Sequence, residues 1–396
     1  MLDASNRLQK RELLIQMGPS HPALHCTANV SLQMAGETVA TAHLEIGHHH
    51  RGIEKMCEQS TYDQCFPYAD RLNCLSPAIG SVGLALTVEK LLGLTVPERT
   101  QYIRTIIAEI ARVQEHLSFL AAISHALGSL PAMRMAVEAR ESYSALFQEL
   151  TGARVTLSYA RVGGVRFDLP DGFAERFASC AIRTEQQVTA IAGMLQSDVL
   201  FAQRMCGVGV MPRDLAVNYG FTGPCLRASG IDYDIRKDIP YLIYDRLDFA
   251  VPVGENGDNF DRYLVRLEEI RQSISIVRQC LRQIPQGAIC AADWRVVRPP
   301  RADVLGTMEG LIAQYELTID GPLVPRGEVY GSVEGGNGEL GFYLVSDGSG
   351  RPYRLHVRSP GLALLQGLPQ MLQGCGFADI VVTFASLNAV GSEIDR

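Results

Sequence analysis

Apolar and polar residues alternate strictly from Leu24 to Met34, a pattern that predicts a β-strand with one buried face. The residues Ala35-Gly36-Glu37 are typical of a turn, and the chain returns as a second strand from Thr38 to Ile46. These segments predict a β-hairpin, after which the chain leaves for a helical region.

Helical spacing dominates the middle of the chain. Pro97 and Glu98 suit a first helical turn, because proline lacks an N–H that has no partner there and a carboxylate favours the positive helix end. Apolar residues then recur at helical spacing from Ile103 to Leu120. A loop region rich in Gly, Pro and Asp is predicted over about 207–260. Three further long helices are predicted, from about Met135 to Gly152, from Phe173 to about Met205, and from Arg262 to Leu281.

The last hundred residues have a different pattern. The stretch "EVYGSVEGGNGELGFYLVSDGSGRPYRLHVRSP" predicts three strands joined by two glycine-rich turns. A short helix over about 361–372 and a last apolar strand, "DIVVTFAS", are expected to follow. The prediction is therefore an α+β protein, a central helical bundle flanked by small antiparallel β-sheets. We divide the chain at 1–52, 53–300 and 301–396, and expect these regions to form one integrated domain.

Composition narrows the class of protein. The chain has 396 residues, of which 47% are hydrophobic, so it can bury a large core. Its formal net charge of −7 gives no basic footprint for nucleic acid. The first residues are too charged for a signal peptide, and no stretch approaches the roughly 18 apolar residues of a membrane helix. We expect a soluble or peripheral protein, on the cytoplasmic side of any membrane it touches.

Histidine and cysteine raise the question of a metal site. Three consecutive histidines, His48 to His50, precede Arg51, but adjacent residues of a strand or helix do not converge on one ion. The ten cysteines include no Cys-x-x-Cys pair, the spacing by which zinc, iron–sulfur and nickel–iron sites usually take two thiolates from one turn. We expect most of them to be small buried residues, and the chain alone to ligate no metal.

Motifs spread over nearly the whole chain belong together. They are "MGPSHPALH", "HRGIEK", "TYDQCFPYADRL", "VEKLLG", "PERTQYIR", "ELTGAR", "GGVRFDLP", "TGPCLRASGIDYDIRKDIPY", "VPVGENGDNFDRYLVR", "GELGFYLVSDG" and "GSEIDR". In this order they resemble the D subunit of bacterial NADH:quinone oxidoreductase, respiratory complex I, a family related to the large subunit of nickel–iron hydrogenases. The resemblance implies a hydrogenase-large-subunit-like fold. Nickel itself is not expected, because the two Cys-x-x-Cys pairs that hold it in hydrogenases are missing.

The resemblance also implies partners and a role. The chain would be a peripheral-arm subunit of a proton-translocating complex that oxidises NADH elsewhere and reduces a quinone. It would form the quinone pocket with a subunit that carries a 4Fe-4S cluster, and would also contact other peripheral-arm and membrane-arm subunits. His50 matches the motif histidine, and Arg51 and Arg71 match arginines that lie against that cluster. The alternative for each arginine is a salt bridge to Glu54, Asp70 or another acid.

In the family, a loop histidine and a tyrosine after "DRLD" hold the quinone head group. His25 fills the histidine position, with His21 beside it, but "DRLDY" reads "DRLNC" here, so Asn73 and Cys74 replace aspartate and tyrosine. A thiol is shorter and a weaker hydrogen-bond donor than a phenol. The implied quinone-binding residues are therefore His21, His25 and Cys74.

Three further departures affect groups of the same pocket. Cys26 replaces a glycine, Ala126 takes the position of an aspartate that pairs with the loop histidine, and Thr156 replaces a histidine near the cluster. Two readings stay open. Another histidine could substitute as proton donor, the candidates being His48, His116 and His125. Otherwise the chain is a divergent paralogue that keeps the scaffold but passes electrons to another acceptor or has a structural role.

Overall fold

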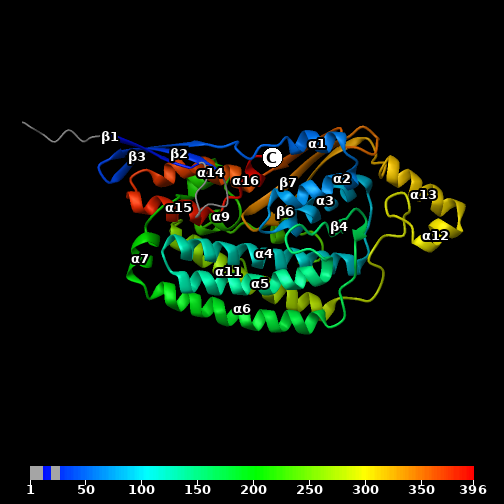
Figure 1. Cartoon of the computed structure of the whole chain (residues 1–396), viewed down its shortest axis with the longest axis horizontal. Coiled ribbons are helices and arrows are strands. Elements are labelled where there is room, and N and C mark those ends of the chain that lie inside the picture. Colours follow the sequence, from blue (N-terminus) through cyan, green and yellow to red (C-terminus); the bar gives the residue numbers. More distant parts are fainter. Residues whose placement is uncertain (1–11, 19–26) are drawn as a thin grey trace, which may run out of the picture.

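The computed structural model describes residues 12–18 and 27–396. Long helices lie side by side as an elongated layer, with small sheets and shorter helices covering one side (Figure 1). The four longest are α4 (Glu98–Ala126), α5 (Leu130–Thr151), α6 (Phe173–Gln196) and α11 (Asn259–Gln283). The α+β prediction, a helical bundle flanked by small antiparallel sheets, is confirmed.

Within the described residues, three antiparallel sheets flank these helices. β1 (Glu12–Met17), β2 (Asn29–Ala35) and β3 (Thr38–Glu45) form the first sheet, with Val30 opposite Leu44. The predicted hairpin is thus confirmed where it is described, and β1 adds a strand that the pattern did not reveal. The other sheets are β4 (Ala160–Arg161) with β5 (Gly164–Val165), and β6 (Gly327–Gly335) with β7 (Gly338–Ser346) and β8 (Arg354–Arg358).

Three helices connect the first sheet to the bundle. They are α1 (Ile53–Gln59), α2 (Tyr62–Leu72) and α3 (Pro77–Leu92). The third sheet packs on α3, where Gly83 allows close approach: a Cβ there would lie 2.9 Å from the Phe342 ring and 3.0 Å from Val333. The third sheet is thereby packed directly against α3.

The remaining helices are short. They are α7 (Val199–Met205), α8 (Arg213–Asn218), α9 (Gly223–Ala228), α10 (Ile235–Asp238), η1 (Tyr244–Arg246), α12 (Arg301–Gly306), α13 (Met308–Ile319), α14 (Pro360–Leu372), η2 (Phe377–Asp379), α15 (Ile380–Leu387) and α16 (Gly391–Ile394). The pair α12 and α13 protrudes at one end (Figure 1). In the part of the chain that is described, no helix combines the length and apolar character needed to cross a bilayer.

Two sequence predictions need correction. The segment "DIVVTFAS" is the helix α15, not a strand. It is buried on nearly every side, and periodicity cannot distinguish a buried strand from a buried helix in so short an apolar run. The helix expected over 173–205 is two helices, because the chain breaks at Ser197 and Asp198, and the Asp198 side chain accepts the Leu200 N–H at the start of α7.

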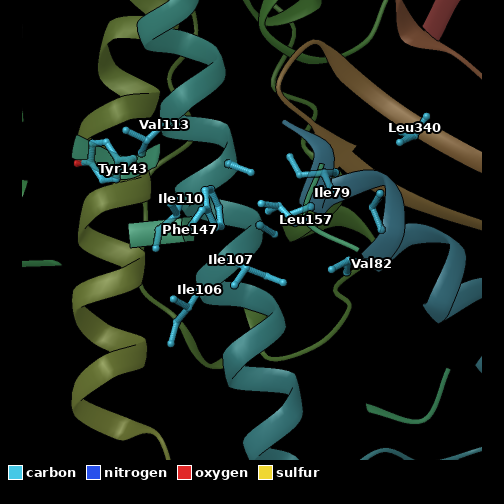
Figure 2. Packing of buried hydrophobic residues seen from close by; sticks show 14 of the residues in the cluster. Ile79, Val82, Ile106, Ile107, Ile110, Val113, Tyr143, Phe147, Leu157 and Leu340 are labelled. Atoms are coloured by element: carbon cyan, nitrogen blue, oxygen red, sulfur yellow. The ribbon is translucent and has the colours of Figure 1, made fainter. Parts of the chain in front are cut away.

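The apolar core is centred on α4. Figure 2 shows Ile106, Ile107, Ile110 and Val113 of this helix between Tyr143 and Phe147 of α5 on one side and Ile79 and Val82 of α3 on the other. All of these side chains are buried. Because α4 is covered all round, its polar residues must find partners inside the protein.

Candidate functional site

The loop that carries the three histidines joins β3 to α1, as predicted, and the C-terminal residues hold it. The Asp395 carboxylate accepts the backbone N–H groups of Gly47 and His49, at 2.9 and 2.8 Å. The Asp395 carbonyl lies 3.0 Å from Nδ1 of His50. The "GSEIDR" ending therefore fixes the position of the loop, a role that its sequence did not reveal.

The three imidazoles do not converge. His49 Nε2 forms a short hydrogen bond with the Thr27 hydroxyl, while His50 binds the C-terminal backbone. Across residues 12–18 and 27–396, no group of three His, Cys, Asp or Glu residues is placed to hold a metal ion. Positions 48 to 50 thus have structural contacts rather than the geometry of a metal centre.

Arg51 is exposed beside this loop. Its Nη1 donates to the His50 and His48 carbonyls, at 2.8 and 3.4 Å. The alternative salt bridge with Glu54 does not form: that carboxylate instead meets Arg354 and His356, at 3.4 and 3.0 Å. The positive charge of Arg51 has no acidic partner among the described residues, so it is free to face another subunit.

Arg71 lies in the last turn of α2 and is also exposed. Its Nη1 donates to the Pro67 carbonyl at 2.8 Å. Asp70 points elsewhere, since its carboxylate accepts the Ser158 N–H in a short hydrogen bond. Burial raises the pKa of Asp70 to about 6, and Arg71 opposes this only weakly. Like Arg51, Arg71 therefore has an exposed guanidinium group that forms no salt bridge with the described residues.

Cys74 sits in the turn between α2 and α3, with its side chain exposed. Desolvation by the surrounding protein, followed by the Glu115 carboxylate, raises the pKa of this thiol, so it stays protonated at neutral pH. The neighbouring Asn73 is buried and shapes the turn, because its Oδ1 accepts the Leu75 N–H at 3.0 Å. A neutral thiol on a fixed turn therefore occupies the position at which a quinone ligand is expected.

A pair of buried carboxyl groups lies directly beneath this turn. Asn73 Nδ2 donates to Glu115 Oε1 at 3.0 Å and to Glu393 Oε2 at 3.2 Å. Burial, followed by the charge of Glu115, raises the pKa of Glu393 to about 7. Neither acid was singled out from the sequence; the only signal was that Asn73 directly follows the motif "TYDQCFPYADRL" and that Glu393 lies in the motif "GSEIDR".

A larger buried charge network supports this region. The Arg227 guanidinium lies 2.6 Å from Glu269 and 3.0 Å from Glu334, and His116 Nε2 lies 2.7 Å from Glu269. Burial, followed by Asp234, raises the pKa of Glu334 to about 7. The network links α4, α9, α10, α11 and β6, and its members are Glu109, Arg112, His116, Arg227, Asp234, Arg236, Glu269 and Glu334.

The other predicted positions are scattered. His21, His25 and Cys26 lie outside the described residues. Ala126 ends α4, and Thr156 lies in the segment after α5. The structure therefore brings Asn73 and Cys74 together with the acids Glu115 and Glu393, but leaves the rest of the predicted pocket untested.

Of the histidines that could substitute as proton donor, His116 is already paired with Glu269. It is fully buried against Glu269, and burial lowers its pKa despite that carboxylate. His125 is exposed in the last turn of α4, and His48 is exposed in the loop before α1.

Comparison with known proteins agrees with this architecture. Residues 126–396 match the family model described as "Respiratory-chain NADH dehydrogenase, 49 Kd subunit". The chain is 47% identical over 395 residues to the NADH-quinone oxidoreductase D subunit of Myxococcus xanthus (strain DK1622), an alignment that covers 100% of this chain and 95% of that relative. It is also 47% identical over 389 residues to the second NADH-quinone oxidoreductase D subunit of Anaeromyxobacter sp. (strain Fw109-5), covering 98% of this chain and 90% of the relative.

A further relative is longer than this chain. The NADH-quinone oxidoreductase C/D subunit of Bdellovibrio bacteriovorus (strain ATCC 15356 / DSM 50701 / NCIMB 9529 / HD100) is 42% identical over 389 residues. The alignment covers 98% of this chain but 70% of the relative.

Proposed function

Because the chain belongs to the family of the 49 kDa subunit of respiratory-chain NADH dehydrogenase, whose members include the D subunits of NADH-quinone oxidoreductases, we propose that it forms the quinone side of such a complex. It is a peripheral-arm subunit of complex I, and its oxidoreductase activity belongs to the assembled enzyme. NADH and quinone are used by the complex as a whole.

The quinone pocket is proposed to lie at the turn after α2. The observation that supports this most directly is the exposed Cys74 thiol, held by Asn73 over two buried carboxyl groups. Reduction of a quinone to a quinol takes two electrons and two protons, so its site needs hydrogen-bond donors and nearby proton-holding groups. We propose that His25, with His21 near it in the sequence, binds the quinone from the segment that precedes β2.

The electron donor is proposed to be a 4Fe-4S cluster in the neighbouring subunit. Arg51 and Arg71, which the resemblance assigns to this contact, are suited to face it, because both are exposed and neither is neutralised by an acid among residues 12–18 and 27–396. A guanidinium near a cluster stabilises the reduced, more negative form and so raises the reduction potential.

Replacing Arg71 with alanine is expected to lower the potential of that cluster. A unit charge about 10 Å away, at an effective dielectric constant of about 20, contributes about 1.7 kcal/mol, or roughly 70 mV for a one-electron couple. Redox titration of the cluster's EPR signal in the assembled complex measures the shift. Arg71→Lys keeps the charge and should leave most of the potential in place, whereas an unmoved potential in Arg71→Ala refutes the contact.

Other contacts follow from the same assignment. The C/D relative joins its two parts in one chain, which supports a separate C component as a neighbour of this chain. We infer further contacts with the cluster-bearing subunit and with membrane-arm subunits, and a location on the cytoplasmic side of the inner membrane. We also infer that the three chain regions act as one body, since β3 packs on α14 and α11 on α15.

Comparison of the native complex with the variant Cys74→Tyr tests the proposed function. The measurement is inhibitor-sensitive quinone reduction by the assembled complex. Clear native activity that tyrosine improves little means that another donor serves the pocket and that quinone is the natural acceptor. No native activity, restored by tyrosine, means that the scaffold is intact but its natural chemistry is no longer quinone reduction, which would refute the proposal.

A further inference from the structure

Among residues 12–18 and 27–396, the two carboxyl groups beneath the Cys74 turn have no positively charged partner. Glu115 of α4 is completely buried and Glu393 of α16 is 2% exposed. No Lys, Arg or His of the described chain lies within hydrogen-bond distance of either carboxylate. Two adjacent buried negative charges without a cation are strongly unfavourable, so one of these groups must keep a proton.

The hydrogen bonds identify which group carries it. Glu115 Oε1 receives amide N–H groups from Asn73, Asn337 and Asn388, at 3.0, 2.7 and 3.5 Å, and its Oε2 receives a short hydrogen bond from the Ser76 hydroxyl. Such a set of donors satisfies an ionised carboxylate.

Glu393 has fewer donors. Its Oε2 accepts from Asn73 at 3.2 Å and its Oε1 from the Ser359 hydroxyl at 3.1 Å, while a backbone hydrogen bond from Gly361 adds a weaker contribution. Burial and the negative charge of Glu115 outweigh these donors, so the pKa of Glu393 rises to about 7. The neutral, proton-bearing form is therefore the resting form of Glu393 below that pH.

Charged groups around Glu393 come from several elements. Glu115 of α4 raises the pKa of Glu393, and Arg358 at the end of β8 lowers it. The pKa of the Cys74 thiol, in the turn after α2, is raised by desolvation and by Glu115 and is lowered by Arg140 of α5. Helix α14, which also packs against α16, has no ionisable side chain.

The last two residues of the chain are engaged elsewhere. The Asp395 carboxylate binds the backbone of Gly47 and His49. Arg396 Nε lies 3.4 Å from Glu54. Neither group supplies a direct hydrogen bond to the buried pair.

A small cavity borders Glu393, and Asn388, which donates to the cavity residue Asn337, has a spare acceptor. The cavity has a volume of about 10 Å³ and is lined by Asn73, Ser76, Asn337 and Glu393, among others, which is room for about one water molecule. Asn388 is 2% exposed, and its Oδ1 has no hydrogen-bond partner in the described structure. These polar residues can thus bind a water molecule that carries protons, in addition to the proton held on Glu393.

We propose that Glu393 is the proton-holding residue of this site and supplies one of the two protons used when the acceptor near Cys74 is reduced. This proposal rests on the proposed function. Asn73 connects the two, since it binds Glu393 and also shapes the turn that presents Cys74.

The step balances with the reactants of the complex. NADH supplies two electrons, and the quinone takes these electrons and two protons to become a quinol. The Glu393 O–H bond breaks, its proton becomes one quinol hydroxyl hydrogen, and the electron pair stays on the carboxylate. The cavity water relays this proton, a proton from the medium then restores Glu393 through the same water, and the second quinol proton also comes from the medium, so that NADH, H⁺ and quinone give NAD⁺ and quinol. Glu393 acts through the cavity and is not placed in contact with the quinone.

The first test uses Glu393→Gln in the assembled complex. NADH-driven quinone reduction is measured from about pH 6 to about pH 8, beside NADH oxidation by a water-soluble acceptor that does not use this pocket. The native rate is expected to fall as pH rises through about 7, because the carboxyl loses its proton there. Glu393→Gln should lower quinone reduction by about 10²-fold at pH 6, remove this fall, and leave the soluble-acceptor rate unchanged.

A charge-increasing variant provides a second readout if the glutamine variant does not assemble. Asn73→Asp keeps an acceptor for the Leu75 N–H but adds a third carboxyl group, so it should raise the pKa of Glu393 further. The fall in rate should then move to higher pH, by about one unit or more. Glu309→Gln removes an exposed carboxylate on α13 and is the matched control, with the native profile expected.

An unchanged pH profile in both Glu393→Gln and Asn73→Asp overturns the proposal. Failure of the proposed function has a different signature, because then the native complex reduces no quinone at any pH. In that case infrared titration decides: a carboxylic acid C=O band that is lost near pH 7 and is missing in Glu393→Gln supports the proton site. If no such band titrates, Glu393 holds no exchangeable proton and the proposal is refuted.

Discussion

Replacing Arg227 with methionine is expected to destabilise the folded subunit so strongly that little of it is found in the assembled complex. The Arg227 side chain is fully buried and donates to Glu269 at 2.6 Å, to Glu334 at 3.0 Å and to the Tyr233 carbonyl at 2.8 Å. Methionine can fill much of the same volume but cannot neutralise these acids. Removing one partner of a buried pair typically costs about 3–5 kcal/mol, a large share of the stability of a folded domain.

The charge balance of the network explains why the loss is large. Four carboxyl groups, those of Glu109, Asp234, Glu269 and Glu334, face three guanidinium groups. Because the pKa of Glu334 is raised to about 7, the network can stay near neutrality by keeping one proton there. Without Arg227, a second carboxyl group must take a proton or remain as an unpaired buried charge.

The amount of this subunit in purified complex and the thermal inactivation of the complex measure the effect. Arg134→Met is the matched control, because Arg134 is 80% exposed and its pair with Glu138 lies on the surface of α5. Such a pair contributes at most about 1 kcal/mol, so the control should assemble normally. Equal yield and equal thermal stability of Arg227→Met and Arg134→Met would show that the buried network does not stabilise the fold.

Replacing His25 with alanine is expected to lower quinone reduction by about 10²-fold or more, with assembly intact. General acid groups typically contribute 10²- to 10⁴-fold, and at this site the phenol of the family is replaced by the Cys74 thiol. The thiol's pKa is raised by desolvation and by Glu115, which leaves it a weak, neutral donor. His116 cannot take over readily, because it is buried against Glu269.

The measurement is quinone reduction at saturating NADH, with the amount of this chain in the complex and the soluble-acceptor activity as checks on assembly. His43→Ala is the matched control, since His43 is exposed on β3 and lies opposite Ser31 in the sheet. Native turnover in His25→Ala would exclude His25 as a quinone ligand. A loss of soluble-acceptor activity as well would instead place the defect in assembly.

Local patterns in the sequence were sufficient for most elements. The alternation from Leu24 to Met34 predicted β2, and the strand expected from Thr38 to Ile46 is β3. The glycine-rich turns predicted the third sheet. A two-residue period and turn residues act over only a few positions, so they can be read locally. The stripe from Ile103 to Leu120 likewise predicted α4. Family motifs added the assignment to complex I, which the comparisons support.

Other features were not accessible from local patterns. The start of α5 at Leu130, rather than near Met135, and the helical state of α15 depend on packing against neighbouring helices. The helices α12 and α13, and the strand β1 with its pairing to β2, were not predicted. In each case tertiary contacts decide what a short or weakly periodic segment does.

The sequence by itself indicated the fold class and the family, and the resemblance implied positions, Asn73 and Cys74 among them, at which a quinone pocket would depart from that family. These are properties of residue type and order. Only the tertiary structure decided that Asn73 bridges Glu115 and Glu393, and that Asp395 fixes the histidine loop. These partners are 42, 320 and 348 positions apart along the chain. No local pattern can encode such pairing, because the desolvation and charge that govern these groups arise only when distant segments pack together.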